Sequence, residues 1–305
     1  MADLQLVIRN ASVATADDSF AADIGVEEGV IVELEAPGRG RSGATEIDAT
    51  GKLVLPGGID SHTHIEQLSA AGVMNADDFH SATVSAAFGG TTTTMSFAAQ
   101  HRGMTIPDVL DDYHARAADK AVIDYAFHLI VADPTPETLT EHLPAAIAQG
   151  VASLKLYMTY DRLMVDDRQI LDILTTARAN GALTMVHAEN HAMIGWMSDR
   201  VVGAGNTRPR YHAVCHTRGA EAEAINRLVA LAELADAPVL VVHVSTIEGI
   251  EEIRQARARG LKVYGETCPQ YLFLTSDDLD RGGLDGAMFC CSPPPRDRAA
   301  QEACW

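Results

Sequence analysis

The sequence has few basic residues for its length. Lys and Arg total 23 against 42 Asp and Glu, which gives a formal net charge of -19. A surface this acidic repels phosphate backbones, so nucleic acid is excluded as the expected partner. Most of the acidity is expected on solvated helix faces, where it favours solubility.

Cysteine is also scarce, and the five cysteines show no regular spacing. An odd count without a CxxC pair argues against a disulfide framework and against a cysteine zinc site. The N-terminus, MADLQLVIRNASV, lacks the basic segment followed by an apolar segment that marks a signal peptide. No run of the sequence reaches the roughly 18 apolar residues of a membrane span. We therefore expect a cytoplasmic protein with reduced thiols and no membrane partner.

The sequence does contain a two-part pattern of strands and helices. Residues 1–52 have the patterning of short β-strands separated by turns, which predicts the N-terminal part of a small β-sandwich-like domain. In residues 53–305, short apolar runs alternate with segments of helical periodicity, which is typical of a parallel sheet covered by helices. The expected strands are 53–60, 91–98, 123–131, 153–158, 183–188, 239–244 and 261–266. This is one strand short of a (β/α)8 barrel. The stretch 287–295 (AMFCCSPPP) is a candidate for a further short strand, but its prolines block a regular crossover helix.

Several of the expected strands end in histidine. His62 and His64 are separated by one residue in PGGIDSHTHIE, so in a strand they point to the same face. Two imidazoles on one face can ligate Zn, Fe, Ni or Mn, although core histidines that are satisfied by hydrogen bonds would show the same pattern. His187 and His243 stand at the ends of two further strands. Because the carboxyl ends of barrel strands converge on one face, the agreement among the four histidines favours a metal site.

Lys155 lies inside the apolar stretch ASLKLYMTY. A buried ammonium is costly unless it is paired or neutralised. One interpretation is a lysine that snorkels to solvent or forms a buried salt bridge. Another is that burial lowers the pKa of the amine, which then takes up CO2 and becomes a carbamate able to bridge two metals. The stretch by itself leaves both interpretations open.

Six segments together carry a family resemblance. PGGIDSHTHIE, SLKLYMTY, VHAEN, VHVST, GETCPQYL and CSPPPRD resemble the cyclic amidohydrolases, and most of all the hydantoinase/dihydropyrimidinase family. The resemblance implies an α/β fold: a (β/α)8 TIM-type barrel of the metal-dependent amidohydrolase type, with its last strand missing from this chain, and a small N-terminal β-rich domain. It also implies hydrolysis of a ring C–N bond in a cyclic amide or imide, such as a hydantoin or a dihydropyrimidine, by a metal-bridged hydroxide.

The resemblance implies metal ligands residue by residue. His62 and His64 match the ligands of the first metal, and His187 and His243 match those of the second. Lys155 matches a carboxylated lysine (N6-carboxylysine) that bridges both. The implied cofactors are two divalent metal ions, taken as Zn2+, together with CO2 as the lysine carbamate.

Two further residues match substrate-binding positions. Tyr160 matches a catalytic tyrosine that hydrogen-bonds the substrate carbonyl and its developing oxyanion. Ser292 matches a serine that holds the ring amide through its backbone. On the sequence alone, an ordinary packing role for Tyr160 is favoured over a catalytic one, and Ser292 is equally consistent with a turn residue before prolines. The implied partner is a small-molecule cyclic amide, and the implied assembly of the full-length form is a homo-oligomer (dimer or tetramer).

One residue of the family pattern has no match. The family carries an aspartate at the end of the eighth strand, which ligates the first metal and shuttles a proton. Asp60 and Asp297 do not fit that motif, and the sequence printed ends at Trp305. We therefore expect a fragment of a longer protein rather than a complete short one, and little hydrolase activity from residues 1–305 alone.

Two alternative functions stay open. Allantoinases and dihydroorotases share the metal pattern, but dihydroorotases use an Arg beside the HxH motif, where this chain has Ile65 and Glu66. The other alternative is a non-catalytic interaction protein on a dihydropyrimidinase-like fold. Such relatives have lost metal ligands, whereas this chain retains all five, so metal content distinguishes the two classes.

Overall fold

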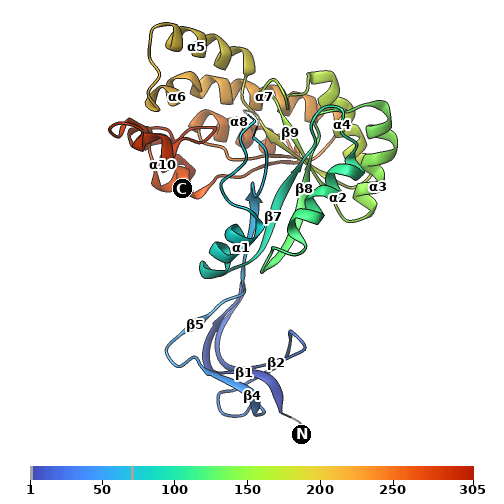
Figure 1. Ribbon diagram of the computed structural model, residues 1–305, viewed down its shortest axis with the longest axis vertical. Coiled ribbons are helices and arrows are strands. Elements are labelled where there is room, and N and C mark those ends of the chain that lie inside the picture. The colour runs from blue at the N-terminus through green and yellow to red at the C-terminus, as the bar shows by residue number, and fades with distance from the viewer. Residues whose placement is uncertain (1–2, 70–71) are drawn as a thin grey trace. The chain divides into compact units, whose positions relative to one another are not determined.

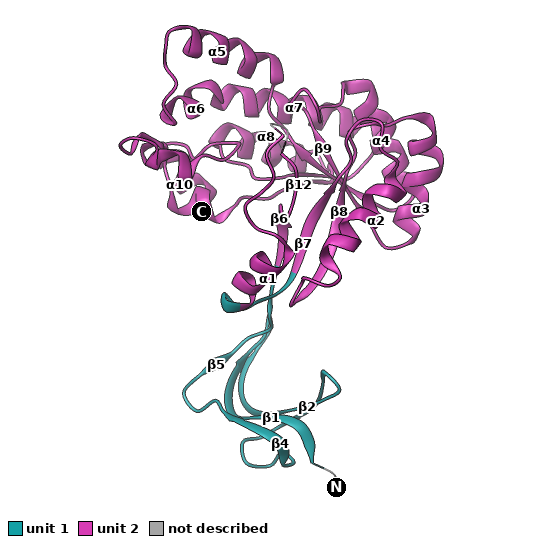
Figure 2. Cartoon of the chain, viewed as in Figure 1, with its two compact units in different colours: residues 1–59, 88–93 teal, residues 60–87, 94–305 magenta. Residues whose placement is uncertain are grey.

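A computed structural model describes residues 3–69 and 72–305 and divides the chain into two compact units. One unit comprises the residues up to Ile59 together with Phe88–Thr93, and the other comprises Asp60–Ala87 and Thr94–Trp305 (Figure 2). The division falls later than residue 53, where the sequence suggested a boundary. The reason is that β5 (Leu53–Val54) pairs with β1 of the first unit, so residues 53–60 are not one barrel strand.

The first unit is built on a single sheet. Its strands are β1 (Leu4–Ala14), β2 (Ser19–Glu27), β3 (Val30–Glu35), β4 (Gly43–Asp48) and β5. The central strand β1 pairs antiparallel with β2 and parallel with β4 and β5. The small apolar core consists of Ala11, Val13, Ala22, Ile24 and Ala49. The prediction of a β-rich N-terminal segment is confirmed.

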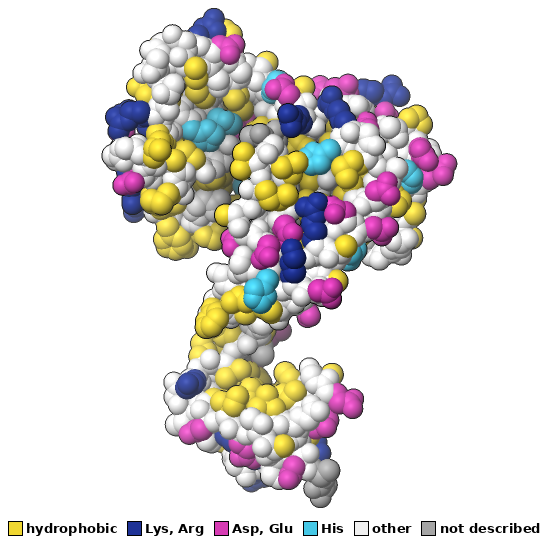
Figure 3. Space-filling model, in the orientation of Figure 1, with side chains coloured by type: hydrophobic (Ala, Val, Ile, Leu, Met, Phe, Trp, Pro, Cys, Tyr) yellow, Lys and Arg dark blue, Asp and Glu magenta, His cyan; other side chains and the backbone are white. Residues whose placement is uncertain are grey.

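Apolar side chains also reach the surface of the first unit. Val30, Ile31 and Val32 of β3 are each at least half exposed. Figure 3 shows hydrophobic side chains grouped on the surface of this unit. The described residues therefore leave part of this sheet without an apolar partner.

The second unit is organised around a curled sheet of seven strands, counted within the described residues, in the order β12-β11-β10-β9-β8-β7-β6. The strands are β6 (Gly58–Thr63), β7 (Thr91–Ala99), β8 (Asp124–Ile130), β9 (Ser153–Tyr157), β10 (Leu183–His187), β11 (Val239–Val241) and β12 (Val263–Gly265). Neighbouring strands from β8 to β12 run parallel. Apart from its start at β6, the predicted strand series is confirmed. The suggested strand at 287–295 is wrong, because Asp285–Phe289 forms a 3-10 helix and a loop follows it.

Helices alternate with these strands and then follow them. They are α1 (Phe79–Phe88), α2 (Ile106–Ala117), α3 (Leu143–Ala148), α4 (Asp167–Ala179), α5 (His191–Gly203), α6 (Arg210–Cys215), α7 (Arg218–Ala235), α8 (Ile247–Ala258), α9 (Pro269–Phe273) and α10 (Arg298–Cys304). Figure 1 shows α2, α3 and α4 on one side of β8 and β9. Local sequence fixes where such helices begin: Asp166 and Gln169 form a capping box at the start of α4. None of the helices in the described parts of the chain combines the length and apolarity needed to span a membrane.

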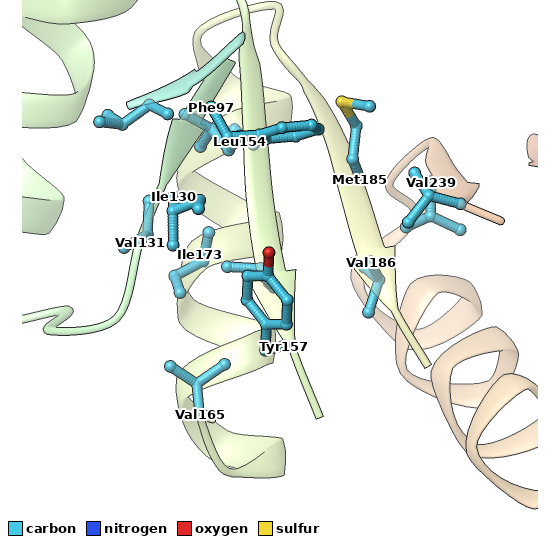
Figure 4. Close-up of a cluster of buried hydrophobic side chains, with 14 of the residues drawn as sticks. Phe97, Ile130, Val131, Leu154, Tyr157, Val165, Ile173, Met185, Val186 and Val239 are labelled. Carbon is cyan, nitrogen blue, oxygen red and sulfur yellow. The ribbon is translucent and has the colours of Figure 1, made fainter. Parts of the chain in front are cut away.

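The main apolar core lies in the second unit. Leu154 and Leu156 of β9 and Ile173 of α4 are fully buried. Figure 4 shows Leu154 and Ile173 within this cluster, together with Val186 of β10. Because side chains alternate along a strand, Lys155 points to the opposite face of β9 from the two leucines. That face carries the residues singled out by the sequence.

Candidate metal centre

The four predicted histidines lie close together in the second unit. Ring centroids are separated by 5.5 Å between His62 and His64, and by 5.6 Å between His62 and His243. The centroids of His187 and His243 are 4.5 Å apart. Three strand ends, distant in sequence, therefore deliver their imidazoles to one place, as expected for parallel strands.

Lys155 is fully buried beside these histidines. In the sheet it is paired with Ile130 of β8 and Met185 of β10. Its Nζ lies 5.1 Å from the ring centroids of both Phe97 and Tyr157. Burial lowers the pKa of Lys155 to about 7, with Glu266 and Cys268 acting in the opposite direction. The amine is therefore far more often neutral at pH 7 than an exposed lysine, which is the state that reacts with CO2.

Two side-chain acceptors fix the rings of the HxH pair. Glu266, directly after β12, accepts a hydrogen bond from His62 Nδ1 at 2.7 Å. The same Oε1 accepts from the backbone N–H of His243 at 3.3 Å. Gln67 Oε1 accepts from His64 Nδ1 at 2.6 Å. In both rings, Nε2 is thus the nitrogen left to bind an ion, which is the arrangement that orients metal-ligating histidines.

His187 is held through its other nitrogen. Its Nε2 bonds to Glu189 Oε2 at 2.8 Å, which leaves Nδ1 as the ligating nitrogen. Glu189 is fully buried, and its Oε1 bonds to His216 Nδ1 at 2.9 Å. Burial would raise the pKa of Glu189, but the hydrogen bonds with the two histidines hold it below its usual value. The carboxylate therefore stays ionised and keeps its hold on His187.

Three of the imidazoles are held in their neutral form. Burial lowers the pKa of His64 to about 3, and it also lowers the pKa of His187 and His243. Nδ1 of His243 is buried and has no hydrogen-bond partner in the described structure. A buried polar atom without a partner is costly, and a metal ion is one group that would satisfy it.

The donor set fits a divalent ion, although the side chains are not gathered around one. Within residues 3–69 and 72–305, no three His, Cys, Asp or Glu side chains stand close enough to hold a metal. Neutral imidazoles suit Zn2+ and its neighbours in the first transition series, and a carbamate on Lys155 would add two oxygens.

Tyr160 borders His187, and the hydroxyl of Ser292 lies next to Tyr160. The ring centroid of Tyr160 is 5.1 Å from that of His187, and its backbone has a positive φ of 71°. Burial raises the pKa of Tyr160, the charge of Glu189 adds to the rise, and the hydroxyl of Ser292 opposes it. The positive φ of Tyr160 is a strained backbone conformation for a residue other than glycine, and strain of this kind is found mainly at functional sites. Ser292 Oγ lies 3.1 Å from His212 Nε2.

Sequence reasoning assigned no role to Gln67, Glu189 or Glu266. Gln67 and Glu189 stand within three residues of a predicted ligand, and Glu266 ends the last expected strand. These positions were the signal available in the sequence. A carboxylate in such a place is ordinarily read as a solvated residue, and only its contact with a histidine reveals its role.

Comparisons with known proteins find relatives that match nearly the whole chain. The D-hydantoinase of Rhizobium radiobacter is 41% identical over 303 residues, which are 99% of this chain and 65% of that protein. The D-hydantoinase of Streptomyces coelicolor is 43% identical, with 98% of this chain and 65% of that protein covered. The solved dihydropyrimidinase from Brevibacillus agri superposes with a TM-score of 0.94 at 40% identity, covering 98% of this chain and 65% of that one.

The chain thus spans 65% of the length of these curated relatives. The barrel-type fold expected from the sequence is confirmed by the structural match. The sequence pattern of the amidohydrolase family matches residues 53–269, a range that includes all five predicted metal ligands. This chain belongs to the amidohydrolase family.

Proposed function

We propose that this chain forms the metal- and substrate-binding part of a cyclic amidohydrolase that opens a hydantoin or dihydropyrimidine ring. The observation that carries the proposal is the fully buried Lys155, whose pKa is lowered, beside four histidines. A lysine in this position would destabilise a core that served only for apolar packing, because burying the amine removes it from water without a compensating hydrogen bond. Modified by CO2, the same side chain becomes the anion that a pair of cations needs.

The metal centre is the first part of this proposal. Amidohydrolases generally use a binuclear metal centre. His62 and His64 would hold one ion, His187 and His243 the other, and carboxylated Lys155 would bridge them. When bound, Zn2+ supplies Lewis acidity and lowers the pKa of water from 15.7 toward about 7. Glu266 and Glu189 are hydrogen-bonded to histidines, so we assign them positioning roles rather than proton transfer.

Tyr160 and Ser292 would position the ring. Because the pKa of Tyr160 is raised, its hydroxyl stays protonated and can donate to a carbonyl that gains negative charge. The backbone of Ser292 would hold the ring amide, and His212 Nε2 fixes the loop by bonding to the Cys291 carbonyl at 2.8 Å. D-hydantoinase and dihydropyrimidinase relatives support a ring amide as the substrate class.

Metal content tests the proposal. We would refold the chain with zinc and 13C-bicarbonate, then measure zinc by elemental analysis and carbamate by 13C NMR. We expect about two ions per chain and one carbamate resonance. The Lys155→Met variant serves as the control and should lose both signals. Near-zero zinc in the unsubstituted chain would overturn the proposal.

Ring opening is then measured directly with dihydrouracil and a 5-substituted hydantoin. Because the aspartate of the family pattern has no match in residues 1–305, we expect this turnover to be slow. A zinc-loaded chain that neither binds nor converts either ring would refute these substrates while leaving the metal centre in place. Conversion of dihydroorotate or allantoin instead would move the assignment to the other cyclic amidohydrolases.

A further inference from the structure

Arg296 is a buried cation at the meeting point of three segments. Its side chain is 5% exposed. Nε donates to Ser245 Oγ at 3.0 Å, and Nη2 donates to Glu221 Oε2 at 3.1 Å. Nη1 donates to the backbone carbonyl of His216. The guanidinium therefore binds the loop after β11, the helix α7 and the segment before α7 at the same time.

Glu221 extends this contact toward His243. One carboxylate oxygen accepts from the backbone N–H groups of Ser245 and Thr246, at 2.9 and 3.2 Å. The same oxygen accepts from Thr246 Oγ1 at 3.0 Å. His243 precedes Ser245 by two residues and has a positive φ of 44°. The strained backbone that carries His243 is thus pinned immediately after the histidine, by the carboxylate that pairs with Arg296.

A second branch leads from Arg296 to His187. The carbonyl of His216 accepts from Arg296, and the ring of His216 bonds to Glu189 at 2.9 Å. Glu189 in turn bonds to His187 at 2.8 Å. All four of these residues are buried.

Arg296 also anchors the loop that carries Ser292. Its backbone carbonyl accepts from the N–H of Ser276 at 2.8 Å. Earlier in the loop, the carbonyl of Pro293 accepts from Tyr271 Oη at 2.6 Å. The loop is therefore fixed at both ends, and the end at Arg296 is the one joined to the histidine-bearing strands.

We propose that Arg296 is a positioning residue that sets the Ser292 loop and the strand ends carrying His187 and His243 as one rigid unit. The importance of Arg296 for catalysis rests on the proposed function, whereas its coupling of the Ser292 loop to the two strand ends does not. The ligand pair and the substrate-contacting loop would then keep their spacing without direct contact between them.

The chemistry of arginine explains why this residue type is needed. A buried ion pair contributes little net stability compared with packed apolar residues, so its presence favours a role in specifying geometry. The planar guanidinium presents donors in several fixed directions, and the three contacts of Arg296 use three different nitrogens. Lysine keeps the charge but cannot satisfy the three acceptors together in that geometry.

Arg296→Lys tests the coupling, with Arg298→Lys as the matched control. Arg298 lies two residues further along, and its side chain is 76% exposed and paired with Glu302. Backbone amide exchange is measured by mass spectrometry over residues 187–190, 243–246 and 290–297. Zinc affinity is measured by competition with a chromophoric chelator. We expect Arg296→Lys to speed exchange in all three segments and to weaken zinc binding about tenfold, while Arg298→Lys changes neither.

The outcomes separate the two proposals. Faster exchange confined to 290–297 would overturn the coupling, because Arg296 would then hold only its own loop. If the unsubstituted chain binds no zinc, the proposed function fails, and the exchange pattern still decides the coupling. Should Arg296→Lys not fold, Glu221→Leu combined with Arg296→Met removes both buried charges together. Unchanged exchange in all three segments of that double variant would also overturn the inference.

Discussion

Lys155→Met should stabilise the metal-free protein at low pH. The substitution removes an ionisable group from the interior and keeps a long unbranched side chain. Burial lowers the pKa of Lys155 from 10.5 to about 7. At about 1.36 kcal/mol per pKa unit, the protonated lysine costs the folded state up to about 5 kcal/mol. Because Met packs without a charge, we expect the variant to recover several kcal/mol of this below pH 7.

The advantage of the variant should shrink as the pH rises. Folded Lys155 releases its proton near pH 7, whereas the unfolded chain keeps that proton up to a pH near 10.5. Between these values the unfolded state binds more protons, so the free energy of unfolding of the unsubstituted protein increases with pH. This gain in stability is complete above about pH 10.5, and it is lost progressively as the pH falls from there to 7. The Met variant lacks this group and therefore lacks this slope.

Urea unfolding followed by tryptophan fluorescence measures the difference. Both tryptophans, Trp196 and Trp305, lie in the second unit, so the signal reports the unit that contains Lys155. The two proteins are compared at pH 6 and pH 9.5 with a chelator in CO2-free buffer, which prevents carbamate formation. A stability difference that is the same at both pH values would refute the reasoning, as would a less stable variant at pH 6.

Three further perturbations follow from the same site. Glu266→Gln removes the charged acceptor of His62 and should weaken zinc binding about 10- to 100-fold in a chelator competition; an affinity within twofold of the original would contradict the role of Glu266. Phe97→Ala removes a fully buried ring 4.7 Å from those of His62 and His64, and should lower the free energy of unfolding by about 3–5 kcal/mol in urea. A loss below about 1 kcal/mol would show that the cavity collapses. Zinc at a thousandfold excess over its Kd should raise the free energy of unfolding by about 4 kcal/mol, and a chelator should reverse this; no change in the urea midpoint would count against a metal centre.

Most of the strand series was predictable because alternation of apolar runs and helical segments is a local property. The exceptions were segments whose conformation is not decided by their own apolar pattern. Leu53–Val54 has the apolar character of a barrel strand, but β1 is the strand it pairs with. The apolar residues of 287–295 suggested a strand, yet Asp285–Phe289 turns as a 3-10 helix before the prolines.

The candidate site divides in the same way. The histidines could be found because their spacing and their place at strand ends are visible in sequence. Gln67 and Glu189 stand within three residues of the histidines that they hold, but Glu266 meets His62 only after the sheet curls and brings β6 and β12 into the same unit. Arg296 was hidden for a similar reason, because a cation in a proline-rich loop ordinarily points to solvent. Contacts between distant segments decide these roles, and local patterns do not report them.

The neutral state of the buried imidazoles has a consequence for how the site responds to acid. Metal binding normally competes with protons for its ligands, and histidine sites lose affinity as the pH falls below about 6.5. His64, His187 and His243 carry lowered pKa values, so an ion that binds them displaces no proton at neutral pH. Lys155 must instead lose a proton, with a pKa of about 7, before it can take up CO2. The acid limit for assembling the proposed centre thus passes from these three histidines to a single lysine, and dissolved CO2 would be as important to its formation as the metal.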